Sequence, residues 1–250
     1  MIIIKTSDEI KKMAQASRIV SIVLKELENY IKPGITTKDI ESFADGIVAK
    51  EGGKSAFKNY RGYPANLCAS VNNEIVHGIP SKKKILKEGD IIGIDLGVVY
   101  KGYIGDAAKT YPVGKIAEKA SRLIKITKES LLRGIEMARP NKRVSDISNA
   151  IQTYVEANGY SVVRNFVGHG VGKDLHEEPQ IPNFGLPNKG PRLKEGMALA
   201  IEPMVNEGGY DVNILNDGWT AVTADGSLSA HFEHTVIVTK NDPLILTKHD

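Results

Sequence analysis

Part of this 250-residue chain recurs within it at an offset of 107 positions. The four residues Leu86–Gly89 read Leu-Lys-Glu-Gly, and Leu193–Gly196 read the same. Further pairs at this offset are Pro33 and Pro140, Asp39 and Asp146, Ile40 and Ile147, Val48 and Val155, and Gly52 and Gly159. Such a repeat indicates two copies of one supersecondary unit. We therefore predict one domain over residues 1–250, built from two similar halves of roughly residues 1–110 and 111–250.

Each half is predicted to begin with two helices. Apolar residues at helical spacing predict them at residues 7–30, 37–51, 116–138 and 144–157. Ser7 is the predicted N-cap of the first helix, and Thr36 or Thr37 that of the second. Strands are expected to follow each pair of helices.

A buried strand with an acid in its middle follows the first pair of helices. Residues 90–99 are rich in β-branched side chains, but Asp95 interrupts them. If the chain turns at Tyr100-Lys101, Asp106 on the returning strand faces Asp95 directly. Like charges in that position destabilise a sheet, so we expect a divalent cation between the carboxylates. The alternative is a displaced turn that leaves one aspartate facing solvent.

Three later residues could join these aspartates as metal ligands. His169 is flanked by glycines, and Glu202 and Glu233 are single acids in apolar, strand-like segments. Taken singly, His169 could equally be a hydrogen-bonded structural residue, and either glutamate could be a core acid paired with a lysine. Together with the aspartates they give four carboxylates and one imidazole, which suit two first-row divalent ions better than a lone structural zinc. Such a pair of metals is typical of hydrolytic sites.

The composition excludes several other classes. Hydrophobic residues make up 41% and charged residues 25% of the chain, as in globular proteins. The net charge is only +3, and the basic run Lys82–Lys84 is interpreted as a solvated loop, with weak contact to an acidic partner such as RNA as the alternative. No specific nucleic-acid binding is therefore expected. No apolar stretch approaches the ~20 residues of a membrane span, and the single cysteine, Cys68, favours a reducing compartment, so we expect a cytoplasmic protein.

The sequence does not support a phosphate-binding P-loop or a cysteine nucleophile. Gly53–Ser55 resembles the end of a P-loop, but Val48 stands where the first glycine would have to be. Cys68 is better explained as an apolar pocket wall than as a nucleophile. His176, seven residues after His169, could be a substrate-binding group or a surface histidine.

Several motifs together resemble a known family. They are Tyr63-Pro64 through Cys68, Val76–Pro80, the Asp95 to Asp106 spacing, Gly168–Gly170, Ile201–Pro203 and His231–Thr235. From the first helix to about Thr239 the chain resembles the type I methionine aminopeptidases, metallopeptidases of the pita-bread fold. The order of the five candidate ligands is shared with proline-directed relatives, whereas the segment around His77 and Cys68 resembles enzymes that act on methionine.

The resemblance implies an α+β fold with two pseudo-symmetric halves and a curved antiparallel sheet covered by helices on its outer face. It implies a single catalytic domain that releases the initiator methionine from nascent polypeptides with a small second residue. The expected partners are peptide N-termini, with transient ribosome association, no membrane contact and a monomeric state. A proline-specific peptidase of the same fold and a non-catalytic binding protein are the alternatives. The short chain disfavours the first, and the intact set of ligands disfavours the second.

The same resemblance implies roles for particular residues. The implied ligands of two divalent ions (Co, Mn, Fe, Zn or Ni) are Asp95, Asp106, His169, Glu202 and Glu233. Asp106 and Glu233 would bridge the ions, and Glu202 would shuttle protons for a bridging water that attacks the scissile carbonyl. His77 and His176 would bind the substrate and stabilise the tetrahedral intermediate. The methionine side chain would lie against Tyr60, Tyr63, Cys68, Trp219, Phe57 and Leu175.

Overall fold

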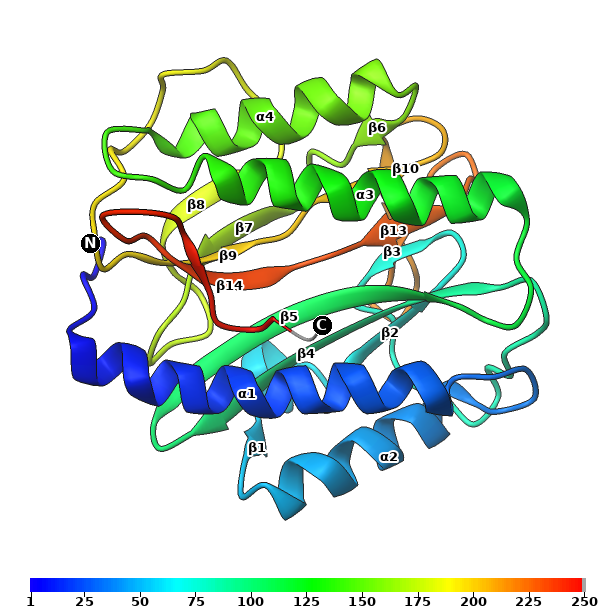
Figure 1. Ribbon diagram of the computed structural model, residues 1–250. Coiled ribbons are helices and arrows are strands. Elements are labelled where there is room, and N and C mark those ends of the chain that lie inside the picture. The colour runs from blue at the N-terminus through cyan, green and yellow to red at the C-terminus, as the bar shows by residue number, and fades with distance from the viewer. Residues whose placement is uncertain (249–250) are drawn as a thin grey trace.

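The computed structural model describes residues 1–248, in which two pairs of helices flank a layer of antiparallel strands (Figure 1). The helices are α1 (Ser7–Tyr30), α2 (Thr37–Lys50), α3 (Glu118–Glu136) and α4 (Val144–Ala157). The strands before α3 are β1 (Lys54–Ser55), β2 (Cys68–Val71), β3 (Glu74–Val76), β4 (Ile91–Tyr100) and β5 (Tyr103–Pro112). Those after α4 are β6 (Ser161–Val162), β7 (Val167–Gly170), β8 (Glu177–Pro182), β9 (Ala198–Ile201), β10 (Met204–Asn206), β11 (Val212–Ile214), β12 (Ala221–Thr223), β13 (Ser229–His231), β14 (His234–Ile237) and β15 (Leu244–Ile245).

All four predicted helices are present, with small differences at their ends. The predicted N-cap Ser7 is wrong, because the N-cap of α1 is Thr6. The Thr6 hydroxyl accepts from the Glu9 backbone N–H at 3.3 Å, and the Glu9 carboxylate accepts from the Thr6 N–H at 2.9 Å. This capping box satisfies two N–H groups at the helix start, which a cap at Ser7 would leave open. Thr36, one of the two predicted candidates, caps α2 in the same way.

The two halves repeat the same backbone contacts at the predicted offset. Thr36 forms an isolated antiparallel bridge with Ile85, and Arg143 forms the equivalent bridge with Arg192. These bridges hold the start of α2 against the loop before β4 and the start of α4 against the loop before β9. The predicted α+β architecture with pseudo-symmetric halves is therefore confirmed.

The hairpin of β4 and β5 is the longest pair of strands, and its register differs from the prediction. The turn lies at Lys101-Gly102, whose φ angles of 49° and 76° are both in the left-handed region. Two-residue hairpin turns favour that conformation, and a glycine supplies it easily. Asp95 consequently pairs with Ala108, and Asp106 with Gly97. The predicted direct pairing of the two aspartates is wrong by two residues, which still leaves both on one face of the hairpin.

The seam between the halves runs beside this hairpin. The Thr235 hydroxyl accepts from the Asp106 N–H at 3.0 Å and donates to the Asp106 carbonyl oxygen at 2.8 Å. The Glu233 N–H donates to the Ala108 carbonyl oxygen at 2.9 Å. Thr235 lies on β14 within a five-stranded sheet of order β15-β14-β9-β7-β8. Strands from both halves therefore meet where Asp106 and Glu233 lie.

Each half buries its own apolar core under its helices. In the first half Leu24 on α1, Ile40 on α2 and Ile94 on β4 belong to one buried cluster. In the second half Leu123 on α3 and Ile147 on α4 belong to the cluster that covers β9. Fully burying an aliphatic side chain of this size contributes roughly 1.5–3 kcal/mol. Within residues 1–248 no helix has both the length and the apolar character that crossing a bilayer requires.

Candidate metal centre and substrate cavity

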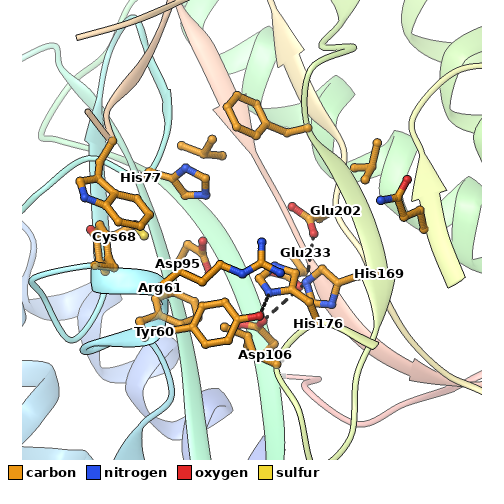
Figure 2. A pocket seen from close by; sticks show the side chains of 18 of the residues that line it. Tyr60, Arg61, Cys68, His77, Asp95, Asp106, His169, His176, Glu202 and Glu233 are labelled. Carbon is orange, nitrogen blue, oxygen red and sulfur yellow. Dashed lines mark hydrogen bonds and ion pairs between the residues drawn. The ribbon is translucent and has the colours of Figure 1, made fainter. Parts of the chain in front are cut away.

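The five predicted ligands converge from five different strand segments (Figure 2). Asp95 and Asp106 lie on β4 and β5, and His169 lies on β7. Glu202 directly follows β9, and Glu233 directly precedes β14. Asp106, His169 and Glu233 are buried, and the ligand atoms of these three lie within 4.8 Å of one another. The fold therefore brings together residues that stand far apart in the sequence.

The glycines around His169 allow this strand to lie unusually close to its neighbours. A Cβ atom on Gly168 would lie 2.4 Å from the carbonyl oxygen of Ala200, and one on Gly170 would lie 2.2 Å from that of Glu178. Any larger residue would push β7 away from β9 or β8. The flanking glycines thus set the position of the imidazole.

The His169 ring presents a lone pair to the carboxylates. Its Nδ1 lies 2.9 Å from the Gly170 carbonyl oxygen, which can only accept, so Nδ1 carries the proton. Its Nε2 lies 3.4 Å from Glu202 Oε1 and 4.0 Å from Asp106 Oδ2. Burial lowers the pKa of His169 to about 4, so the ring is neutral at pH 7. A lone pair facing two carboxylates is the arrangement of a metal ligand rather than of a hydrogen bond.

Several buried oxygen atoms of this cluster have no partner among residues 1–248. They are Asp95 Oδ1, Asp106 Oδ1 and Glu233 Oε1. Leaving a buried carboxylate oxygen unpaired is costly, and a divalent cation would satisfy all three. The donor set of carboxylates and one imidazole is of the type that such cations accept. The residues present therefore fit a metal.

The carboxylates also raise one another's pKa. Burial raises the pKa of Asp106 to about 7. Burial, and after it the charge of Asp106, raises the pKa of Asp95. Burial, and after it the charges of Asp106, Glu202 and Asp95, raises the pKa of Glu233. Burial followed by the charges of the two aspartates raises the pKa of Glu202. Without a cation the cluster would hold protons that isolated carboxyls release.

One cavity of about 530 Å³ joins this cluster to an apolar wall. Its lining includes all of the predicted pocket residues, namely Phe57, Tyr60, Tyr63, Cys68, His77, Leu175, His176 and Trp219. Tyr63 is fixed by its hydroxyl, which lies 3.1 Å from the Gly78 carbonyl oxygen, and its ring meets Trp219 edge to face at 5.2 Å. Burial raises the pKa of the Cys68 thiol, so this side chain is a neutral part of the wall.

The two predicted substrate-binding histidines lie on opposite sides of the cavity (Figure 2). The His176 ring is 4.2 Å from that of His169, and its Nδ1 lies 2.8 Å from the Tyr60 hydroxyl. His77 has a left-handed backbone with φ of 62°, and its ring meets Phe166 edge to face. Burial lowers the pKa of His77 to about 4, and burial with the neighbouring His169 lowers that of His176. Both rings are neutral at pH 7 and can donate one hydrogen bond.

Some residues at or near the cavity were not predicted as site residues. His231 Nε2 lies 3.6 Å from Glu202 Oε2, and among residues 1–248 this nitrogen has no hydrogen-bond partner. The spacing of two residues between His231 and Glu233 was the available signal, because alternate residues of an extended strand share a face. Arg61 and Phe166 line the cavity itself. Neither stands in a sequence pattern that distinguishes it from a surface or core residue.

Comparison with known proteins identifies the class. The model of metallopeptidase family M24 matches residues 11–240. The chain belongs to this family, and its pita-bread fold is the predicted one. It is therefore a metallopeptidase, as the buried ligand cluster indicates.

Within that family the chain is similar to methionine aminopeptidases. Methionine aminopeptidase 1 of Bacillus subtilis is 54% identical over 248 residues, covering 99% of this chain and 100% of the relative. The crystal structure of methionine aminopeptidase from Thermotoga maritima superposes with a TM-score of 0.98 at 51% identity, covering 99% of this chain and 100% of that one. A prolidase from Pyrococcus furiosus has a TM-score of 0.81 at 25% identity, and only 66% of its length is covered.

Proposed function

We propose that this protein is a methionine aminopeptidase that removes the initiator methionine from nascent polypeptides with a small second residue. The observation that carries the proposal is the single cavity that joins the metal-ligand cluster to an apolar, aromatic wall. A thioether side chain matches a pocket of aromatic rings and a neutral thiol, because sulfur packs favourably against aromatic edges. The likeness to methionine aminopeptidases over nearly the full length supports the same assignment.

Two divalent cations are the proposed cofactors, with Co, Mn, Fe, Zn and Ni as candidates. Asp95, Asp106, His169, Glu202 and Glu233 would hold them. Unpartnered oxygen atoms on Asp95, Asp106 and Glu233 support a ligand role for three of these four carboxylates. When bound, the cations supply Lewis-acid polarisation of the scissile carbonyl and lower the pKa of a water molecule.

The protein's own groups perform the remaining tasks. Glu202 is the proposed proton shuttle, because its carboxylate lies at the cavity beside the other proposed ligands. His77 and His176 are neutral and each can donate a hydrogen bond to a carbonyl oxygen of the substrate or of the tetrahedral intermediate. Tyr63, Cys68 and Trp219 would hold the methionine side chain. Tyr60, Phe57 and Leu175 are the remaining proposed contacts of the substrate.

The cellular setting is also a proposal. We infer a single catalytic domain over residues 1–250 with halves of about 1–110 and 111–250, because the site lies on the seam between the halves. A monomeric, cytoplasmic enzyme that meets nascent N-termini near the ribosome is consistent with one buried cysteine and a small net charge.

A peptide assay tests the proposal. Purified protein is incubated with Met-Ala-Ser after addition of Co(II), Mn(II) or Fe(II), and released methionine is measured. Methionine release is expected, whereas Pro-Ala-Ser and Xaa-Pro peptides should stay intact. Cleavage of Xaa-Pro alone would indicate the prolidase-like alternative. Failure to release methionine with every metal would overturn the proposal.

A further inference from the structure

His176 stands on a short connection between two strands of the site. Strand β7 carries His169, and the connection to β8 runs through Val171 to His176. Three backbone bonds hold the start of this connection: the Val171 N–H donates to the Ala198 carbonyl oxygen at 3.1 Å, the Gly172 carbonyl oxygen accepts from the Ile104 N–H at 2.8 Å, and the Gly172 N–H donates to the Asp174 carbonyl oxygen at 3.1 Å. The position of His176 therefore depends on side chains at the base of the connection.

Glu177, the residue after His176, forms an ion pair with Lys5 at that base. The side chains are only 3% and 5% exposed. Among residues 1–248 no other pair of a lysine or arginine with a carboxylate has both side chains less than a tenth exposed. Glu177 Oε1 also accepts from the Lys173 N–H at 3.0 Å, so the carboxylate joins both ends of the connection.

The space around the ion pair is closely fitted. A Cβ atom on Gly172 would lie 2.3 Å from Glu177 Oε1 and 2.4 Å from Lys5 Nζ. Lys5 itself is fixed from outside the connection, because its N–H donates to the Gly196 carbonyl oxygen at 2.8 Å and Ile4 bridges Met197. The pair thus fastens the His176 connection to the segment that leads into β9.

Net stability does not explain such a pair. The desolvation of two buried charges offsets most of their attraction, and apolar replacements of similar volume are often as stable. A buried pair does, however, fix geometry, because each charged group has one place where it is satisfied. Because Glu177 directly follows His176, the fixed geometry of the ion pair also fixes the backbone next to His176.

We propose that Lys5 is a positioning residue: through Glu177 it holds the ring of His176 at its place beside His169 and Tyr60. This inference rests on the proposed substrate-binding role of His176. Lys5 makes no contact with the reacting atoms, and its effect reaches the reaction only through the 173–177 connection.

The test is a double-mutant cycle measured on Met-Ala-Ser with Mn(II). Lys5→Met should lower kcat by about tenfold, because small misplacements of a catalytic group cost up to about a hundredfold. KM and metal content should change by less than about twofold. In a His176→Asn background the same substitution should lower kcat by less than about twofold, since the group it positions is gone. The matched control is Lys11→Met, which removes an exposed lysine that pairs with Asp8 and should leave every value unchanged.

A second variant tests the proposal in case Lys5→Met does not fold. The pair Lys5→Met with Glu177→Met leaves no unpaired buried charge, and it should fold with a Tm close to that of the parent while kcat stays reduced. Full kcat in this folded variant, or an equal effect of Lys5→Met in both His176 backgrounds, would overturn the proposal.

A readout independent of catalysis separates this inference from the proposed function. The imidazole nitrogen resonances of His176, assigned by their loss in His176→Asn, are recorded by 15N NMR for protein loaded with diamagnetic Zn(II). Lys5→Met should shift or broaden them, whereas Lys11→Met should not. Unchanged resonances would contradict the positioning role even if the parent protein released no methionine. A parent that is inactive while the resonances respond would contradict only the proposed function.

Discussion

Asp95 and Asp106 lie on paired strands but two residues out of register, so that each faces an uncharged residue and both carboxylates share one face of the hairpin. The stagger keeps the acids from direct cross-strand contact while both line the same cavity. Both belong to a cluster whose buried charges raise one another's pKa. The strongest tests of the site therefore concern charge.

Replacing a central acid should separate activity from folding. Asp106→Asn removes a carboxylate from the cluster formed with His169 and Glu233. We expect bound metal to fall and kcat/KM on Met-Ala-Ser to drop by at least about a hundredfold. Metal content is measured by mass spectrometry beside the activity, with Asp8→Asn as the control because Asp8 is exposed. Normal metal content with normal activity would contradict a ligand role for Asp106.

The metal-free protein should lose stability as the pH rises. In the folded state the pKa of Asp106 is about 7, against an ordinary value of 3.8. Between these values the folded state binds more protons than the unfolded state, so the free energy of unfolding falls with increasing pH. After metal removal with EDTA, the Tm of the parent minus that of Asp106→Asn should decrease by at least about 3 °C between pH 5 and pH 7.5. A difference that is constant or increases would show that the carboxyl is ionised without cost.

The aromatic wall should determine the preference for methionine. Trp219→Ala removes the ring that meets Tyr63 at 5.2 Å. We expect kcat/KM on Met-Ala-Ser to fall by about 10–200-fold, mostly through KM, because a lost apolar contact acts on binding. Metal content should not change. An unaltered KM would place the methionine side chain elsewhere.

The hydroxyl of Tyr60 should matter through His176. It lies 2.8 Å from His176 Nδ1, and Tyr60→Phe removes it while keeping the stacked ring. We expect kcat to fall about tenfold, as for other hydrogen-bond partners of active-site groups. Tyr30→Phe is the matched control, because the Tyr30 ring stacks on Phe43 outside the cavity. Equal rates for the two variants would exclude a role for the hydroxyl.

Much of the fold could be predicted because short-range patterns in the sequence determine it. The four helices follow from apolar periodicity, and the symmetry follows from one repeated block of four residues. The hairpin register was not predicted correctly, because it depends on which two residues adopt left-handed backbone angles. Gly102 supplies one of them, and a turn at Tyr100-Lys101 would have had no glycine.

The site was predictable to a different extent for its acids and for its pocket. A lone acid in an apolar strand is conspicuous, and the structure brings all five predicted ligands to one cavity. Pocket aromatics are not conspicuous, since Tyr63 and Trp219 could equally have been core residues, and their assignment rested on resemblance. His231 was missed because its 3.6 Å contact with Glu202 joins two separate segments, and its spacing of two residues from Glu233 indicates only a shared face.

The hydrogen bonds between Thr235 and Asp106 have a consequence for how the protein becomes active. They join backbone from one half to a strand of the other at the very residues that hold the cluster. Neither half alone carries all five proposed ligands, because Asp95 and Asp106 lie in the first half and His169, Glu202 and Glu233 in the second. A complete ligand set therefore exists only where the two halves are assembled against each other.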